Sequence, residues 1–164
     1  MGLAFIALQV KEIYSQPASP EKPPRPVEIF SVKNLSFGKI VAGNGDVTVT
    51  NDGDRTTTGT VQTLGSDYGP ALFDIEANPG TEVRLGLNNG QDFTLYNDDG
   101  PGQLTVSLSE ILIEGQEFGH NETFIMPVGK KSVEGEIGGT IQNLTQSQNS
   151  GNYASSFDIT VVYE

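Results

Sequence analysis

The chain has 164 residues and a formal net charge of −12, with 20 glycines, 9 prolines and no cysteine. This length is enough for one domain with a hydrophobic core of its own. The acidic balance argues against binding to nucleic acid or to an anionic membrane through a basic face. The lack of cysteine excludes disulfide scaffolds, cysteine-ligated zinc and thiol nucleophiles.

Residues 1–26 read as an apolar, signal-like segment followed by a proline-rich tether. The first ten residues are apolar; they are too few to cross a bilayer as a helix but fit the apolar part of a secretory signal. No lysine or arginine precedes them and no clean cleavage site follows, so an ordinary N-terminal helix or strand is the alternative. Five prolines between positions 17 and 26 predict an extended spacer. We expect residues 1 to about 16 to be removed or disordered in the mature protein.

Residues 27–164 are expected to form a single folded domain. Segments rich in β-branched and aromatic residues are separated by Gly, Asn and Asp turn signals at intervals of roughly eight to twelve residues. Strands are expected at 27–38, 46–50, 55–64, 71–77, 81–87, 92–96, 103–110, 122–127, 131–144 and 151–164. Residues 111–121 are expected to be irregular. About nine or ten short strands, without a sustained helical period, predict an all-β sandwich or barrel.

The C-terminal segment, residues 151–164, has the clearest strand pattern. Its odd positions carry Tyr153, Phe157, Ile159, Val161 and Tyr163. Because side chains alternate between the faces of a strand, we expect one face to be buried and the other to be wet. Val162 interrupts the polar series and suggests that the outer face is partly covered near the end. Tyr163 has two interpretations, an aromatic of the core or rim, which we favour, and part of an edge that a neighbouring protein pairs with.

The first strand of the domain decides between two expectations for assembly. The alternation across residues 27–32 is weak, because Phe30 and Val32 fall on the face opposite Val27 and Ile29. A strand that is apolar on both faces belongs inside its own sandwich. We therefore favour a monomer over a donor-strand polymer, in which this strand would complete a neighbouring subunit.

An ordered set of short motifs resembles a known family. The motifs occupy residues 35–38, 45–49, 55–59, 70–75, 133, 137–141, 151–153 and 157–161. In this order they are similar to the secreted bacterial family called domain of unknown function 4402, over nearly all of residues 27–164. That family resembles spore-coat-U-like proteins and archaic chaperone–usher pilins. Ala154 and Ser155 depart from the family, which commonly has a glycine-containing turn there.

The resemblance implies an immunoglobulin-like antiparallel β-sandwich in a secreted or surface protein of structural or adhesive character. It transfers no catalytic residue. It implies other surface-protein subunits or a periplasmic chaperone as partners, although such domains also occur singly.

Few side chains suggest a chemical reaction. His120, the one histidine, lies in a polar loop, so a solvated loop residue is favoured over a general base. Carboxylate pairs that could hydrolyse a glycoside are Asp52 with Asp54, Asp98 with Asp99, and Glu134 with Glu136. The aspartates stand beside glycines in turns, where they cap the backbone, and the glutamates share one strand face, expected to be the wet one.

Two further patterns are compatible with modification or metal binding. Residues 51–54 and 97–100 supply oxygen ligands for calcium, but neither matches a full calcium-loop spacing, and turn chemistry is the simpler interpretation. Asn34, Asn121 and Asn143 match the acceptor pattern for N-glycosylation, which arises often by chance in a threonine-rich chain. We therefore assign no catalytic, cofactor-binding or metal-binding residue. We expect no cofactor, no nucleic-acid partner and no membrane span.

Together these observations predict a secreted or cell-surface, non-enzymatic structural or adhesin-like protein. The alternative is an extracellular sandwich that binds glycan or calcium through its Asp- and Asn-rich loops.

Overall fold

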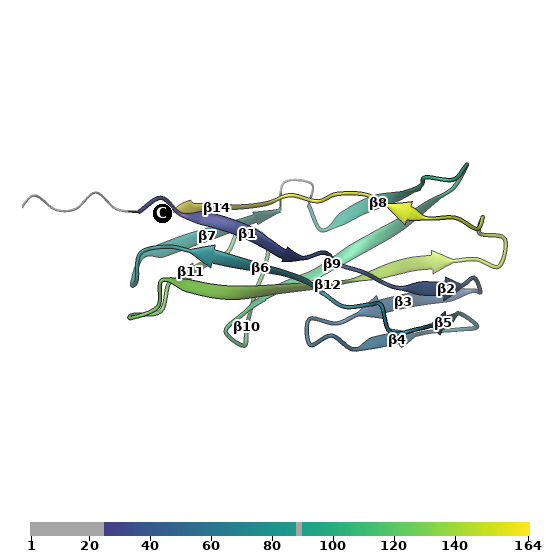
Figure 1. Cartoon of the computed structure of the whole chain (residues 1–164), viewed down its shortest axis with the longest axis horizontal. Helices are drawn as coiled ribbons and strands as arrows, with labels where there is room; N and C mark the ends of the chain where they lie inside the picture. The colour runs from purple at the N-terminus through teal and green to yellow at the C-terminus, as the bar shows by residue number, and fades with distance from the viewer. Residues whose placement is uncertain (1–24, 88–89) are drawn as a thin grey trace, which may run out of the picture.

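The computed structural model describes residues 25–87 and 90–164, and within them all regular structure is β-strand. The molecule is elongated, with its strands running along the long axis (Figure 1). The strands are β1 (Glu28–Lys33), β2 (Lys39–Val41), β3 (Gly45–Val49), β4 (Arg55–Thr57), β5 (Gln62–Leu64), β6 (Ala71–Glu76), β7 (Glu82–Leu87), β8 (Asp92–Asn97), β9 (Gln103–Ile113), β10 (Gln116–Phe118), β11 (Thr123–Ile125), β12 (Ser132–Leu144), β13 (Tyr153–Ala154) and β14 (Ile159–Tyr163). The expectations for residues 1–24, and for the turn at residues 88 and 89, lie outside the described residues.

The strands form three antiparallel sheets. The largest has the path β1-β6-β12-β9-β8-β13, with β10 added to β9, and with β3 and β4 added to β12. A second sheet has the order β11-β7-β14, and a third consists of β2 and β5. Apolar side chains from the sheets meet in one continuous core. The predicted all-β sandwich is confirmed.

Strand β12 is the centre of the large sheet. One edge of β12 pairs with β9, while the other edge pairs with β6 from Ser132 to Ile137 and with β3 from Gly139 onward. Gly138 lies at the change of partner, where the β9 ladder also shifts its register. A β-carbon at Gly138 would lie 2.2 Å from the carbonyl oxygen of Val49. The close approach of β3 therefore requires glycine at this position.

A buried polar network closes the gap that this bulge leaves in the ladder. The Asn51 side chain, 9% exposed, accepts a hydrogen bond of 2.7 Å from the Gly138 N–H and one of 2.6 Å from the Ser109 hydroxyl. Its Nδ2 donates to the carbonyl oxygen of Glu110 at 3.0 Å. One amide thus joins the turn after β3 to both β9 and β12. Together with the Ser109 hydroxyl, which lies 2.9 Å from the Gly138 nitrogen, it satisfies the backbone donor that the bulge removes from the ladder.

The core follows the predicted alternation where one face of a strand packs on the core and the other faces outward. In β7, Val83, Leu85 and Leu87 are buried. In β6, Ala71, Phe73 and Ile75 are buried, while Leu72 and Asp74 between them are half-buried. Period-two patterning is sufficient to place these strands correctly, because a one-residue slip would turn every apolar side chain to solvent.

The expectation of an irregular segment at residues 111–121 is wrong. Strand β9 continues to Ile113, with Ile111 and Ile113 buried, and then folds back through Glu114 and Gly115 into β10. Both turn residues have positive φ, 50° and 78°. This two-residue turn with positive φ at both positions matches the right-handed twist of a hairpin.

The C-terminal strand differs from its prediction in continuity and in burial. It is divided into β13 and β14 by residues 155–158, which take part in no ladder. The predicted alternation is present, but Phe157, Ile159 and Val161 are half-buried and pack against the core instead of being enclosed by it. Val162 is 50% exposed, so the outer face is not covered there.

Strand β1 pairs with β6 of its own chain, as the sequence predicts. The stated reason, that both faces of the strand are buried, is wrong. Ile29 packs against the core, whereas Phe30 and Val32 are 48% and 56% exposed. These two side chains lie on the outer face of the sheet.

We expect Asn51→Ala to lower the free energy of unfolding by about 1–3 kcal/mol, because it leaves the Gly138 N–H and the Glu110 carbonyl without this partner in a buried site. Chemical denaturation measures the change. Asn34→Ala, which removes the same group from an exposed position, is the control and should change stability far less. Equal effects of the two substitutions would contradict the role given to Asn51.

Candidate functional site

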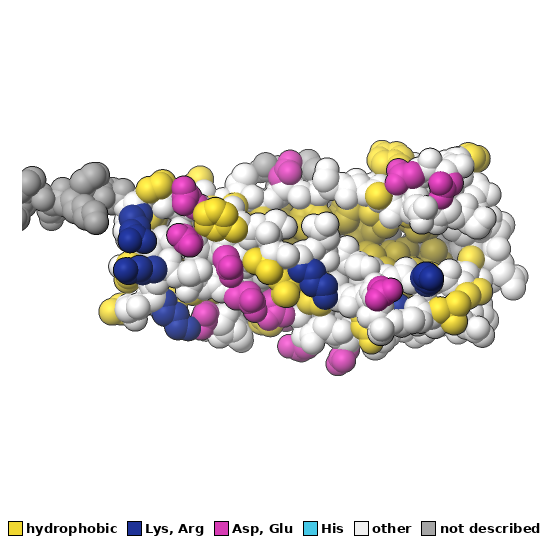
Figure 2. Space-filling model, in the orientation of Figure 1, with side chains coloured by type: hydrophobic (Ala, Val, Ile, Leu, Met, Phe, Trp, Pro, Cys, Tyr) yellow, Lys and Arg dark blue, Asp and Glu magenta, His cyan; other side chains and the backbone are white. Residues whose placement is uncertain are grey.

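A long apolar groove opens on one side of the sandwich. Its volume is about 1140 Å³, and it lies between the chain from Lys33 to Ile40 on one rim and the chain from Asn152 to Ile159 on the other. Figure 2 shows it as a hollow with a yellow, hydrophobic floor near the middle of the molecule. Pockets for small molecules usually measure about 300–1,000 Å³. The groove is therefore large for such a ligand and elongated enough for a segment of polypeptide.

The four strands that border the groove are all edge strands. β1 and β13 end the path of the large sheet, β14 ends the three-stranded sheet, and β2 is one of only two strands in its sheet. Between β1 and β2, the chain makes a single isolated bridge, Ser36 with Gly69. Across the groove, residues 155–158 have no ladder partner. Both rims thus present main chain that is not saturated by sheet pairing.

The floor of the groove is the least complete part of the core. The four most exposed members of the buried core, namely Leu95 (9%), Phe37 (8%), Leu104 (8%) and Ala71 (6%), all line it. The lining also includes most of the half-buried residues that pack on the core, among them Leu35, Ile40, Phe93, Phe157 and Ile159. Elsewhere, core side chains such as Ile75 are fully enclosed. The floor of the groove is therefore slightly more exposed than the rest of the core.

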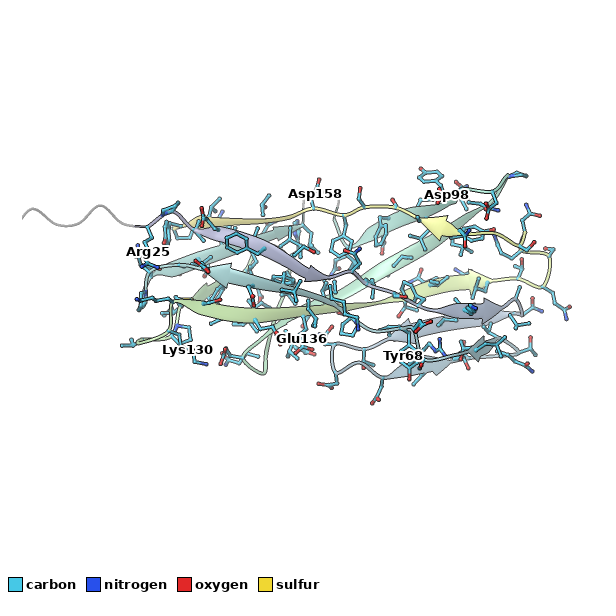
Figure 3. The ribbon with its side chains drawn as sticks, viewed as in Figure 1. Arg25, Tyr68, Asp98, Lys130, Glu136 and Asp158 are labelled. Carbon is cyan, nitrogen blue, oxygen red and sulfur yellow. The ribbon has the colours of Figure 1, made fainter. Side chains whose placement is uncertain are left out.

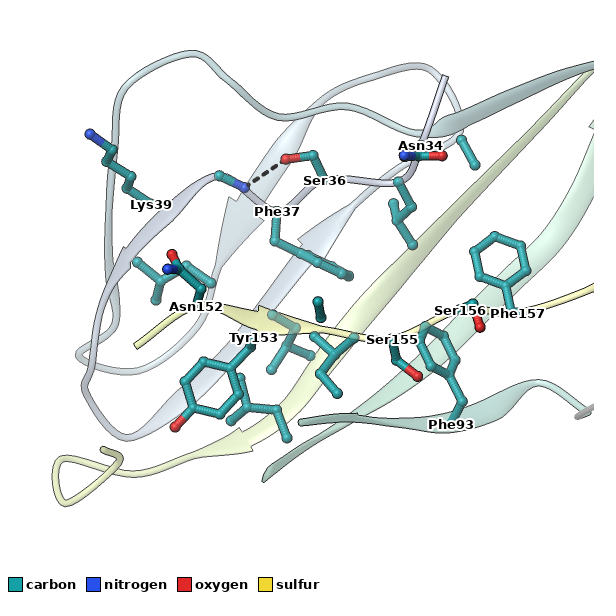
Figure 4. Close-up of a pocket in the computed structure, with 18 of the residues that line it drawn as sticks. Asn34, Ser36, Phe37, Lys39, Phe93, Asn152, Tyr153, Ser155, Ser156 and Phe157 are labelled. Carbon is teal, nitrogen blue, oxygen red and sulfur yellow. Dashed lines mark hydrogen bonds between the residues drawn. The ribbon is translucent and has the colours of Figure 1, made fainter. Parts of the chain in front are cut away.

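Aromatic side chains divide the groove along its length (Figure 4). Phe93 and Phe157 meet with their ring centroids 5.7 Å apart and their planes tilted by 42°. Toward the other end, Tyr153 is fixed by its hydroxyl, which donates to the Asn149 carbonyl at 2.7 Å and accepts from Gln148 Nε2 at 2.9 Å. Phe37 projects from the opposite rim. These rings stand where large apolar side chains of an added layer would pack.

The charge of the groove is opposite to that of the chain. Its lining contains two lysines, Lys33 and Lys39, and one carboxylate, Asp158. Lys39 stands at the mouth of the groove with its side chain directed outward (Figure 4). Asp158 lies on the other rim and points away from it (Figure 3). The lining thus carries two basic side chains and one acidic side chain in a protein with 21 acidic and 9 basic residues.

The structure gives His120 a structural contact. Its Nδ1 accepts a hydrogen bond of 2.8 Å from the Leu87 N–H. Because this nitrogen receives a backbone proton donor, the ring fixes the loop after β10 against β7. In the part of the chain that the structure describes, no hydroxyl is hydrogen-bonded to this ring.

In the two Asp-rich loops, the side-chain oxygens that accept hydrogen bonds belong to Asn51, Asn97 and Asp99. Asn51 faces inward in the network described above, and Asp52 and Asp54 are exposed. In the other loop, Asp99 accepts hydrogen bonds from both nitrogens of Asn152, at 2.8 and 3.0 Å. Among residues 25–87 and 90–164, no three His, Asp or Glu side chains cluster as metal ligands would.

The glutamates of β12 lie on the outer face of the sheet. Glu134 is exposed and Glu136 is half-buried. Desolvation by burial raises the pKa of Glu136, and the neighbouring charges of Glu134 and Asp52 raise it further. This group is an acidic surface outside the groove, visible in Figure 2 as magenta side chains.

Tyr163 fits the first of its two interpretations. It pairs opposite Val83 at the end of β14 and is half-buried against the core. Its hydroxyl accepts from the Asn78 N–H at 3.0 Å and donates to the Arg25 carbonyl at 2.9 Å. Tyr163 therefore holds the start of the described chain against its end.

The sequence does not predict the groove. Its one sequence signal was the apolar pair Leu35 and Phe37 directly before Gly38, in a segment too short to form a paired strand of its own. The pattern of residues 151–164 gives no sign of the groove either, because an alternation of apolar residues does not show whether another strand covers the free edge. Of the three asparagines that match the N-glycosylation pattern, only Asn34 lies on the rim of the groove. Asn121 and Asn143 are outside its lining, and their backbone φ angles are positive.

The fold and the groove define a class: an antiparallel β-sandwich with an incomplete layer bordered by edge strands. The family described as a domain of unknown function, DUF4402, matches residues 27–163. The chain belongs to this family. A comparison with curated proteins finds no similar sequence.

No helix that is long and apolar enough to cross a membrane occurs in residues 25–87 and 90–164.

We expect Glu136→Gln to raise the melting temperature at about pH 8 and to lose this advantage at about pH 4. The raised pKa of Glu136 means that the folded state is penalised when the group is ionised. The penalty is full above the folded pKa, shrinks as the pH falls toward the unfolded value, and is absent below it. Thermal unfolding across this pH range measures the effect.

Glu28→Gln is the matched control, because it removes the same charge from an exposed site on β1. It reports the general relief of charge repulsion in an acidic protein. If both variants gave the same pH profile, the local origin of the Glu136 shift would be rejected.

Proposed function

We propose that the protein is a secreted or cell-surface, non-enzymatic structural or adhesin-like subunit that assembles with other surface proteins. The observation that carries this proposal is the open apolar groove bordered by four edge strands. Edge strands with unpaired main chain are sites for pairing with another chain, and soluble proteins normally shield them. A groove of this kind is therefore better suited to an assembly than to a free monomer.

The groove weakens the expectation, drawn from the sequence, that the protein is a monomer. That expectation rests on β1 staying within its own sheet, and β1 does pair with β6. Self-pairing of β1 nevertheless leaves the groove unfilled, since Leu95, Phe37 and Leu104 remain partly exposed along it. Other surface-protein subunits, or a periplasmic chaperone that covers the groove before assembly, are the partners that this geometry supports.

Several features support an extracellular, non-enzymatic role. The acidic composition and the proline-rich stretch before the domain are typical of an exported domain on a spacer. The single imidazole is engaged by a backbone N–H, and of the paired aspartates Asp99 accepts two hydrogen bonds from Asn152. No converging acid, base and nucleophile occur together among the described side chains.

The second candidate function is a binding module for glycan or calcium. A polar hollow of about 860 Å³, lined by Thr48, Ser107, Glu117 and Gln142 among others, lies on the outer face of β3, β9 and β12. Hydroxyl and amide groups of this kind suit a sugar. The calcium part has less support, because Asn97 and Asp99 already accept hydrogen bonds and no three candidate ligands cluster among the described residues.

Protease treatment of intact cells that carry the native gene, followed by native size separation of extracts, tests the leading proposal. We expect the protein to be cleaved from outside and to migrate with other polypeptides at a mass well above that of one chain. An internal location, or a monomer at the surface, would contradict the structural role. A monomer that binds a glycan array through the polar hollow would favour the second candidate.

A further inference from the structure

We propose that the outer face of the large sheet binds an uncharged, extended polysaccharide along a track that runs from Tyr96 to the polar hollow. This inference deepens the proposed function, on whose adhesin-like and glycan-binding roles it rests, by naming the class of ligand and the surface that holds it. It depends on the register of the strands, on the free polar groups that this register aligns, and on the distribution of charge.

Strand register places rows of uncharged polar side chains on this outer face. Residues that pair directly across the strands form two rows: Ser107, Thr140, Thr48 and Thr56 in the first, and Thr94, Thr105 and Gln142 in the second. The residues that alternate with them on β3, β8, β9 and β12 are buried or pack against the core. The polar side chains of the rows therefore point away from the core.

The groups of the second row are open to a ligand. Among the described residues, no hydrogen bond involves the side chains of Thr94, Thr105 or Gln142. In the first row, the hydroxyls of Thr48 and Thr140 share one hydrogen bond of 2.9 Å, which leaves both oxygens with further acceptor capacity. Hydroxyl and amide groups both donate and accept, as the hydroxyls of a sugar do. The rows thus match the hydrogen-bonding chemistry of a saccharide.

An exposed aromatic ring stands at one end of the rows. Tyr96 follows Thr94 on the outer side of β8 and pairs opposite Gln103 of β9. Tyr96 is 59% exposed, and Gln103 is exposed beside it. A sugar ring carries C–H groups that pack on an aromatic face, while the hydroxyls around its rim need polar partners. An exposed tyrosine beside amides and hydroxyls supplies both.

The rows continue into the polar hollow, which makes the site elongated. Most members of the first row, together with Gln142, also line this hollow. From Gln103 beside Tyr96 to Ser109 in the lining, β9 advances about 20 Å at a rise of about 3.3 Å per residue. One sugar unit would cover only part of such a track, so the track suits several linked units in an extended chain.

The charge of the site selects an uncharged polymer. Asp52 and Glu117 line the hollow, and none of the described residues in its lining is a lysine or an arginine. Asp92 lies at the outer end of the first row, opposite Ser107. Acidic polysaccharides would be repelled by these carboxylates and by the net charge of −12. A second copy of the chain would be repelled in the same way, because it would bring two acidic hollows together.

The test uses the purified full chain and soluble polysaccharides. Hydroxyethyl cellulose and galactomannan are the uncharged probes, and carboxymethyl cellulose has the backbone of the first with carboxylates added. Native electrophoresis through gels that contain each polymer measures the affinity from the retardation of the protein. We expect at least one uncharged probe to bind at least about tenfold more tightly than carboxymethyl cellulose.

Two pairs of variants locate the binding. Tyr96→Ala should weaken binding at least about tenfold, whereas Phe30→Ala, which removes a 48% exposed ring from the outer face of β1, should not. Gln142→Ala removes an open amide from the second row and should weaken binding about threefold or more. Its control is Gln62→Ala, an exposed amide on β5. All four side chains are exposed, so thermal unfolding should show that each variant folds.

The opposite results overturn the proposal. Binding of neither uncharged probe, or equal binding of carboxymethyl cellulose, rejects an uncharged polysaccharide as the ligand. Binding that Tyr96→Ala and Gln142→Ala leave unchanged rejects this face. If the protein self-associates in sedimentation and Tyr96→Ala makes it monomeric, the face is an interface between copies. None of these measurements depends on the location or the assembly of the protein in the cell, so failure here leaves the structural role to its own test.

Discussion

The change of partner along β12 is the constraint on which the rest of the sandwich depends. One edge of this strand pairs first with β6 and then with β3, and the partner changes at Gly138. Only a residue without a β-carbon can stand there, because Val49 approaches so closely. The Asn51 amide then satisfies the N–H group that the bulge displaces from the ladder. With the Ser109 hydroxyl, which also accepts from this N–H, Asn51 allows two different strands to share one edge without a buried unpaired donor.

The groove is a geometrical consequence of that exchange. Strand β6 begins at Ala71, opposite Ile137, and the chain before it turns away from β12. Strand β1 is hydrogen-bonded to β6, so it loses its neighbour where β6 begins. Its continuation toward β2 retains only the bridge between Ser36 and Gly69. On the other side of the groove, the pairing of β14 with β7 stops at Ile159 opposite Leu87. Residues 155–158, which connect β13 to β14, have no ladder partner. Two segments without sheet neighbours therefore face each other above a continuous floor.

The sequence could predict the parts of the fold that local patterning determines. Strands β6 and β7 were placed correctly because their alternation has one register that buries it. The segment at Ile111 and Ile113 was misassigned because its apolar pair runs into a turn with glycine at its second position, and the hairpin that closes it depends on positive φ at Glu114. The C-terminal segment shows more clearly what the sequence pattern could not predict. Its parity was correct, but half-burial of Phe157 and Ile159 depends on whether another strand covers their edge, which is a tertiary property that no local period encodes.

The candidate site was invisible for a related reason. Catalytic and metal sites concentrate chemically distinctive side chains, whereas an apolar groove is built from the same valines, leucines and phenylalanines as a core. Leu95 and Phe37 differ from Ile75 only in a few per cent of exposed surface. Because these residues belong to both the core and the groove, whatever fills the groove also completes the hydrophobic burial that stabilises the domain. Folding and assembly then draw on the same apolar contacts.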